Sequence, residues 1–237
     1  MGRILLIETA TAKLSVALAQ DGRVLASRSC GQPRQQASLT APLVKEVLDS
    51  QGLRTADCDA VAVSAGPGSY TGLRVGVSTA KGLCFGAGLP LISVGTLDVL
   101  AAEMAGQAGN DGYVMPGPDR ASFIVPMIDA RRMEVYTAVY GPDGQRLTPV
   151  EAKVIDADSF AEYLAQGPVL FIGDGALKCR EVLTHPNARF QQAFPEAAAM
   201  APLAEKAWQE KRFEDLAYFE PFYLKDFVAT VSRKNLF

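Results

Sequence analysis

The sequence predicts an α/β protein made of two lobes of similar design. The 237 residues are 49% hydrophobic and 21% charged, an ordinary composition for a globular protein with one large core or two smaller ones. The first hundred residues have the pattern of three strands followed by alternating helices and strands, and the second half repeats that order. We therefore expect lobes at 1–106 and 107–196, with the C-terminal segment 197–237 packing back on the first lobe.

The first lobe begins with a three-stranded meander, in which Asp21-Gly22 is a strong hairpin signal. The expected strands are Arg3–Glu8, Leu14–Gln20 and Arg23–Ser29. An amphipathic helix at about 36–50 follows, although Pro42 within it leaves open a start nearer Thr40. Its apolar stripe contains Leu39, Leu43, Val44, Val47 and Leu48.

A buried strand, a glycine-rich turn and a second helix come next. The strand is expected at 60–64 and the turn at 65–72, and a further strand (91–94) and a helix begun by Thr96 complete the lobe. Residues 107–119 are rich in Gly, Pro, Asn and Asp and are expected to form a linker or a mobile loop.

The second lobe repeats the meander and the alternation. The expected strands are Ser122–Ile128, Glu134–Tyr140, Arg146–Ile155 and Val169–Ile172. A helix from Asp158 or Ser159 to about Ala165 precedes the last strand, another helix follows Gly173-Asp174-Gly175, and a last one is expected at 202–212. Two copies of such a βββαβα unit define the duplicated fold shared by actin, sugar kinases and the Hsp70 ATPase domain, the ASKHA fold.

The glycine turn is the most informative motif, and its pattern permits three roles. Strand, glycine turn and helix can cradle a phosphate on main-chain N–H groups, present a surface to a partner, or simply pack inside the domain. The turn fits no standard nucleotide fingerprint, because no Lys-Ser or Lys-Thr pair occurs and the spacing of Gly66, Gly68 and Gly72 is one residue longer than Gly-x-Gly-x-x-Gly. In the helix, Gly72, Gly76 and Ala80 share one face, which allows close backbone contact. The residues alone leave the three alternatives open.

Composition excludes several classes of function. A net charge of −3 makes independent binding of tRNA or DNA unexpected, and no apolar run reaches the length of a membrane span. Glu8 interrupts the N-terminal apolar run too early for a signal peptide. The four cysteines are widely spaced and form no Cys-x-x-Cys, which favours free thiols in a reducing compartment. We expect a cytoplasmic protein.

Several motifs along nearly the whole chain resemble the TsaB (YeaZ) family. They are Ile7-Glu8-Thr9-Ala10, the block 64–76 with Gly-Pro-Gly-Ser-Tyr-Thr-Gly-Leu-Arg, Ala80–Leu83, the block 128–136 with Asp-Ala-Arg-Arg, Gly173-Asp174-Gly175 and Glu220–Leu224. The glycine block is the most specific of these, and Gly-Asp-Gly by itself would be weak.

The resemblance implies a non-catalytic role in tRNA modification. Members of the family pair with the similar catalytic subunit TsaD to make threonylcarbamoyladenosine at position 37 of tRNAs that read ANN codons, and the P-loop ATPase TsaE joins them. An exposed apolar helical face seldom stays unpaired, so we expect the amphipathic helix and the helix after the glycine turn to form a homodimer when the partner is absent. The resemblance further implies that tRNA is reached only through the complex and that the same two helices form the surface for TsaD. The interface residues it implies are Leu39, Leu43, Val47, Tyr70, Thr71, Gly72, Arg74, Val75, Gly76, Thr79 and Ala80.

The residues themselves argue against catalysis. His185 is the single histidine, so a two-histidine metal site within the chain is impossible, and Ser69 lies outside a Gly-x-Ser-x-Gly elbow. We expect no catalytic residue and no metal ligand. The alternative is an active ATPase or small-molecule kinase of the same fold.

A degenerate nucleotide site is the remaining possibility for ligand binding. Its candidate residues are Glu8, Thr9, Gly66, Gly68 and Asp174, and we expect at most weak binding of ATP or ADP with Mg²⁺, there or at the partner junction. Arg74 is expected to reach across the partner interface. For Arg131 and Arg132 a hairpin turn is the favoured interpretation, and a contact with the partner or with tRNA is the alternative.

Overall fold

The first sheet has five strands in the order β3-β2-β1-β4-β5. The structure, a computed structural model, describes residues 2–32, 34–107 and 121–225. The strands are β1 (Arg3–Glu8), β2 (Leu14–Gln20), β3 (Arg23–Cys30), β4 (Ala60–Gly66) and β5 (Leu91–Gly95). β1 pairs antiparallel with β2 and parallel with β4. It is almost fully buried, as expected for a central strand that is covered on both faces.

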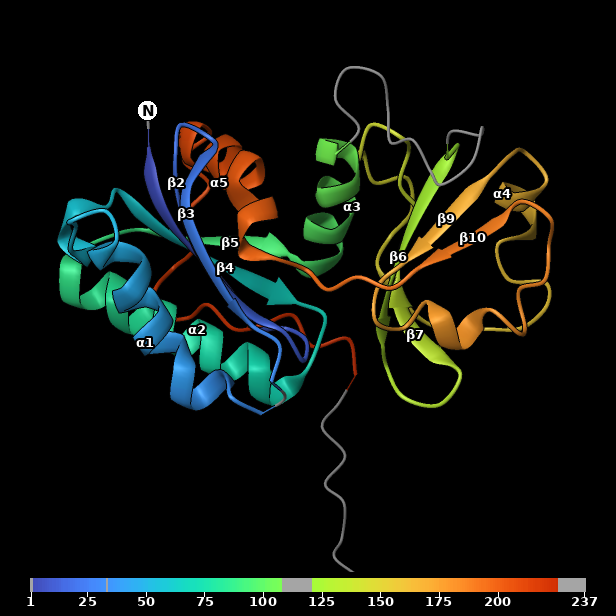
Figure 1. Ribbon diagram of the computed structural model, residues 1–237, viewed down its shortest axis with the longest axis horizontal. Coiled ribbons are helices and arrows are strands. Elements are labelled where there is room, and N and C mark those ends of the chain that lie inside the picture. The colour runs from blue at the N-terminus through green and yellow to red at the C-terminus, as the bar shows by residue number, and fades with distance from the viewer. Residues whose placement is uncertain (1, 33, 108–120, 226–237) are drawn as a thin grey trace, which may run out of the picture.

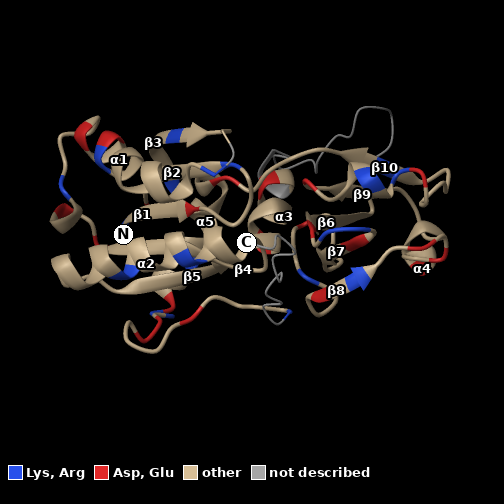
Figure 2. Ribbon diagram, turned by 90° about the horizontal axis from the view of Figure 1, so that it is seen from below, with Lys and Arg blue, Asp and Glu red and all other residues tan. Residues whose placement is uncertain are grey.

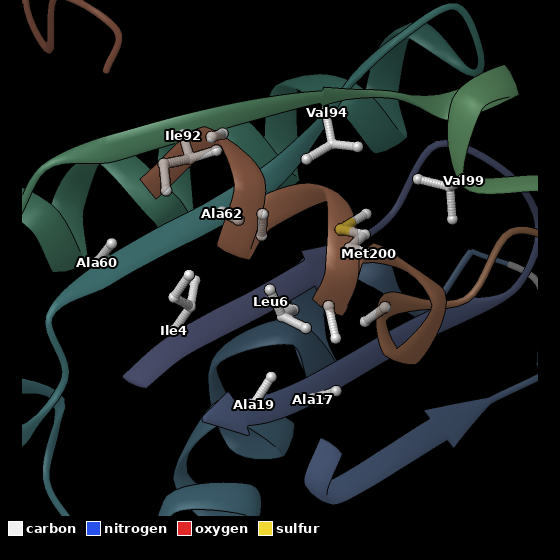
Figure 3. Close-up of a cluster of buried hydrophobic side chains, with 14 residues drawn as sticks. Ile4, Leu6, Ala17, Ala19, Ala60, Ala62, Ile92, Val94, Val99 and Met200 are labelled. Carbon is white, nitrogen blue, oxygen red and sulfur yellow. The ribbon is translucent and has the colours of Figure 1, made fainter. Parts of the chain in front are cut away.

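Helices cover both faces of this sheet (Figure 1). On one face lie α1 (Gln36–Asp49) and α2 (Tyr70–Ala87), whose apolar residues join Leu5, Ile7 and Val63 in one core cluster. On the other face, η4 (Ala197–Met200) and α5 (Ala201–Gln209) pack on Ile4, Leu6 and Ala62 (Figure 3). Residues 197–209 thus pack on the first lobe, because small alanines of η4 and α5 fit closely against the sheet.

The second sheet repeats the first. Its order is β10-β9-β6-β7-β8, and its pairings from β8 to β10 follow the same sequence of directions as those from β3 to β5. The strands are β6 (Phe123–Asp129), β7 (Glu134–Thr137), β8 (Glu151–Val154), β9 (Val169–Ile172) and β10 (Ala188–Gln191). This repeat is the duplicated ASKHA architecture. Figure 2 shows the two lobes side by side, with α3 (Thr96–Gln107) between them.

The second lobe departs from the expected elements in several places. β7 and β8 are shorter than predicted, since Tyr140 and Arg146 form only isolated bridges. The helix predicted from Asp158 or Ser159 to Ala165 is present only as the shorter α4 (Ala161–Leu164). The helix predicted after Gly175 is only the 3₁₀ turn η3 (Leu177–Cys179). β10 was not predicted, because its four residues are all half-buried and give no alternation for a sequence pattern to detect.

The first lobe follows its prediction more closely. α1 begins at Gln36 despite Pro42, which lies on the exposed side of the helix. The short 3₁₀ turn η1 (Thr55–Asp57) joins α1 to β4. The four cysteines are free. Almost all of the expected linker 107–119 lies outside the described residues. Within the described ranges, no helix combines the length and the apolar character that crossing a membrane requires.

Candidate functional site

Glu8 stands at the end of β1, but it is enclosed by its own lobe. Its side chain is completely buried, and Oε1 accepts hydrogen bonds from the Ala10 N–H at 2.6 Å and from the Ser64 hydroxyl at 2.9 Å. Burial raises the pKa of Glu8 to about 7, and these hydrogen bonds only partly oppose the rise. The described residues provide no partner for Oε2. Glu8 therefore acts as a buried packing group and does not face open space where a ligand could bind.

The glycine turn packs against the chain's own backbone. A Cβ at Gly68 would lie 2.5 Å from the carbonyl oxygen of Ala10, and one at Gly66 would lie 2.7 Å from that of Phe222. The Ser69 N–H donates to the same Ala10 carbonyl at 2.7 Å. These glycines thus allow backbone segments to approach each other, and the Ser69 N–H of the turn is already engaged.

The same close packing continues into α2. An added Cβ at Gly72 would clash with the carbonyl oxygen of Thr9, and one at Gly76 would clash with the Thr9 hydroxyl. The Thr9 hydroxyl, itself buried, donates to the Gly72 carbonyl at 2.8 Å. The Thr9 hydroxyl therefore helps to position α2.

A C-terminal strap, residues 213–225, runs along α2 and crosses to the second lobe (Figure 1). Lys81 of α2 donates to the carbonyls of Ala217 and Phe219, each at 3.2 Å. The Phe222 N–H donates to the Ala65 carbonyl at 2.7 Å, which places the strap directly on the glycine turn. Lys225 then forms an ion pair with Glu134 of the second lobe. The family motif 220–224 thus closes the glycine turn and joins the lobes, a role that sequence reasoning missed.

In the second lobe, the strand-end carboxyls are occupied by internal contacts. Asp174 accepts the Asp129 N–H at 2.9 Å, and burial raises its pKa. Asp129 accepts the Arg131 N–H at 2.9 Å and forms an ion pair with Lys178. Arg131 and Arg132 form the β6–β7 hairpin turn, as favoured from sequence. Asp174 thus belongs to the second lobe and Glu8 to the first, and each of these two predicted nucleotide residues is held by contacts of its own lobe.

The serine and the histidine weighed from the sequence stand on different lobes. Ser69 caps α2, accepting the Gly72 N–H at 3.3 Å, and His185 lies exposed in a second-lobe loop. Groups of three or more His, Cys, Asp or Glu with a geometry suited to a metal are absent from the described ranges. A hollow of about 430 Å³ lies between the lobes on the α5 side, and none of the five candidate nucleotide residues lines it.

The residues implied for a partner face on α1 and α2 differ in their burial within the chain. Four of the implied interface residues are buried within the lobe, namely Val47, Gly72, Gly76 and Ala80. They face the sheet, where small side chains are needed for close packing. Leu39, Leu43, Tyr70, Val75 and Thr79 are half-buried, and Thr71 and Arg74 are exposed.

A second stripe of small residues on α2 points outward. An added Cβ at Gly82 or Gly86 meets nothing within 4 Å, and Ser78 is exposed. Phe85, between the two glycines, is 84% exposed. The four-residue spacing of Gly82 and Gly86 is visible in the sequence, but only burial shows which glycine stripe faces solvent. We call Thr71, Ser78, Gly82, Phe85 and Gly86 the outer face of α2.

Comparisons with known proteins agree on one family. The family model "TsaD: tRNA N6-adenosine threonylcarbamoyltransferase" matches residues 32–232. The chain is 32% identical to the tRNA threonylcarbamoyladenosine biosynthesis protein TsaB of Escherichia coli over 96% of both chains. It is 32% identical to the Bacillus subtilis protein of the same name over 72% of this chain and 70% of that one.

Solved structures give the same result. A Pseudomonas aeruginosa protein described as similar to the peptidase YeaZ superposes with a TM-score of 0.81 at 27% identity, covering 95% of this chain and all of that one. YeaZ from Pseudomonas aeruginosa superposes with a TM-score of 0.78 at 28% identity, covering 94% of this chain and all of that one.

Proposed function

The chain belongs to the TsaB (YeaZ) family of tRNA threonylcarbamoyladenosine biosynthesis proteins, and we propose that within this pathway it is a non-catalytic subunit. It acts as scaffold and activator of TsaD through a heterodimer, and the pair recruits TsaE to modify adenosine 37 of tRNAs that read ANN codons. The chain contacts tRNA only within this complex. It needs no cofactor of its own, and ATP or ADP with Mg²⁺ binds only at the junction with TsaD.

The observation that carries this proposal is the closely packed glycine turn. A phosphate-transferring enzyme of this fold needs main-chain N–H groups that are open to the phosphates at such a turn. Here the Ser69 N–H already donates to the Ala10 carbonyl, the backbone of Phe222 packs against Gly66, and the Glu8 side chain is completely buried. The packing supports a structural subunit, and no observation favours the alternative of an active ATPase or small-molecule kinase.

The outer face of α2 supports a partner helix. Gly82 and Gly86 leave room for close approach of a second backbone, and Phe85 offers apolar area that the lobe does not cover. Arg74 at the start of the same helix is exposed. We assign this face to TsaD, and to a second copy of the chain when TsaD is absent.

The test is reconstitution with TsaD of the same species, measured by size exclusion with light scattering. Gly82→Arg and Phe85→Asp should fold normally, because both positions are open, but should abolish the complex and the homodimer. Val154→Asp on β8, where the side chain is 66% exposed, is the matched control and should leave both intact.

Activity separates the two functional classes. The wild-type chain should be required for threonylcarbamoyladenosine formation by TsaD and TsaE supplied with threonylcarbamoyl-AMP, and it should hydrolyse no ATP alone. ATP hydrolysis by the isolated chain, with no complex formed, would instead establish the ATPase alternative.

A further inference from the structure

We propose that the β6–β7 turn, with Arg131 and Arg132 at its tip, contacts the phosphate backbone of the RNA substrate. This inference rests on the proposed function, which brings the chain to tRNA inside a complex. It gives the Asp-Ala-Arg-Arg motif a role that neither the fold nor the partner face requires.

The backbone of the turn is more costly than the hairpin needs. Arg131 and Arg132 both lie in the left-handed region, with φ values of 72° and 52°. Side chains with a Cβ adopt this region rarely and at an energetic cost, whereas Asn-Gly adopts it readily and is a common hairpin turn. Two arginines in these positions therefore disfavour the turn, which indicates that their side chains serve a purpose outside the fold.

Both guanidinium groups are available to a ligand. The two side chains are exposed, and across the described residues neither forms an ion pair. Asp129, the carboxyl nearest to Arg131 along the chain, accepts the Arg131 main-chain N–H and is already neutralised by Lys178, and Glu134, the nearest to Arg132, pairs with Lys225. Asp129 thus holds the backbone of the turn and leaves the arginine side chains free to bind an anion.

The turn lies in a basic and aromatic neighbourhood formed by both lobes. Lys178 lies beside the turn, where it pairs with Asp129. Lys225 also neutralises Glu134.

The first lobe adds aromatic rings to this neighbourhood. Tyr70 stacks on Tyr223 with ring centroids 4.9 Å apart, and the Arg74 guanidinium lies 5.8 Å from the Tyr223 ring centre. Tyr223 and Lys225 lie two residues apart on the strap, so the strap joins these rings to Glu134 of the β6–β7 hairpin. A guanidinium group suits phosphate because its planar fork matches two phosphate oxygens. Aromatic side chains provide surfaces on which bases stack, so the two together are typical of nucleic-acid contacts. This favours RNA over an acidic protein as the ligand.

The experiment measures binding of a fluorescein-labelled, unmodified tRNA transcript to the assembled complex with TsaD at several KCl concentrations. The double variant Arg131→Asn/Arg132→Gly keeps a turn that fits the backbone and removes both charges. We expect it to assemble normally, to bind the transcript several-fold more weakly, and to reduce the slope of log K against log salt by about 2, close to one unit for each phosphate that the variant no longer neutralises. Its melting temperature should rise, because the left-handed strain is relieved.

Two controls make the test specific. Arg131→Lys/Arg132→Lys keeps the charges and should retain most of the affinity and the salt slope. Arg23→Ala removes an exposed arginine of the first lobe and should change neither.

Three outcomes would overturn the inference. If the Arg131→Asn/Arg132→Gly variant binds the transcript with wild-type affinity and wild-type salt slope, the RNA contact of the turn is overturned, while the proposed function remains intact. Loss of TsaD from the variant complex would make the turn a protein contact. A wild-type complex that fails to bind the transcript would overturn the proposed function and this inference together.

Discussion

Glu8 illustrates how burial changes the use of a strand-end carboxyl. The side chain is completely enclosed, and its two hydrogen bonds come from Ala10 and Ser64 of the same lobe. Because water is excluded, the neutral form is favoured and the pKa rises from 4.5 to about 7. Because the pKa of Glu8 differs between the folded and the unfolded state, its ionisation is coupled to folding.

This coupling predicts a pH dependence of stability. Between pH 4.5 and 7 the folded state holds a proton on Glu8 that the unfolded state has released, so the free energy of unfolding should fall as the pH rises, by about 3 kcal/mol over that window. Below pH 4.5 the Glu8 carboxyl is protonated in both the folded and the unfolded state, so it no longer makes the free energy of unfolding depend on pH. Glu8→Gln should remove this part of the slope in urea titrations at a series of pH values.

Glu103 supplies the internal comparison. Burial also raises its pKa to about 7, so a residual slope should persist in Glu8→Gln. Equal slopes in the wild type and the variant would show that Glu8 is ionised in the folded state throughout.

At the level of elements, α2 carries two stripes of small residues with opposite roles. Gly72, Gly76 and Ala80 face the sheet and let the helix sit on the β1–β2 loop, whereas Gly82 and Gly86 face open space. The same residue type thus serves internal packing on one side of the helix and an accessible surface on the other.

The two stripes predict opposite effects of adding one methyl group. Gly76→Ala forces a Cβ against the Thr9 hydroxyl and to within 3.4 Å of Val63, so the free energy of unfolding should fall by about 1–3 kcal/mol. Gly82→Ala, the matched control, meets nothing and should raise it by about 0.5–1 kcal/mol through better helix propensity. Urea unfolding of the two variants measures both values, and a destabilised Gly82→Ala would mean that this side of α2 is covered within the monomer.

At the level of the whole molecule, the C-terminal strap joins the two lobes where the glycine turn ends. The Phe222 N–H bonds to the turn, the Tyr223 ring stacks on Tyr70, and Lys225 pairs with Glu134 of the second lobe. The chain thus supplies its own bridge between the lobes at this point. The strap therefore connects α2 of the first lobe with β7 of the second.

Tyr223→Ala tests this bridge. Removal of the stack on Tyr70 and of the Arg74 Nε hydrogen bond to the Tyr223 hydroxyl at 3.3 Å should lower the free energy of unfolding by about 1–2 kcal/mol. Hydrogen exchange at the Phe222 amide, which donates to the Ala65 carbonyl, should become faster because the strap opens more often. Tyr218→Ala, at a tyrosine that is 83% exposed, should change neither property. Unchanged exchange at Phe222 in Tyr223→Ala would mean that the main-chain contacts alone hold the strap.

The sequence by itself determined the class of the fold, its duplication and most of the first lobe. Strand runs, the Asp21-Gly22 turn and the glycine motif are local signals, so they can be detected without knowing what packs on them. The second lobe was harder, because its short edge strand β10 and the 3₁₀ turn at Leu177–Cys179 carry weak periodicity. The family also followed from motifs that are contiguous in the chain.

Only the tertiary structure decided what those motifs do. Helical spacing shows that Gly72, Gly76 and Ala80 share a face, but which face meets the sheet depends on the position of Thr9, about sixty residues earlier in the chain. Likewise, Ala10 and Phe222 pack against the glycine turn, and its closure involves residues from both ends of the chain. Burial and contact are properties of the folded arrangement, and a local pattern leaves them open.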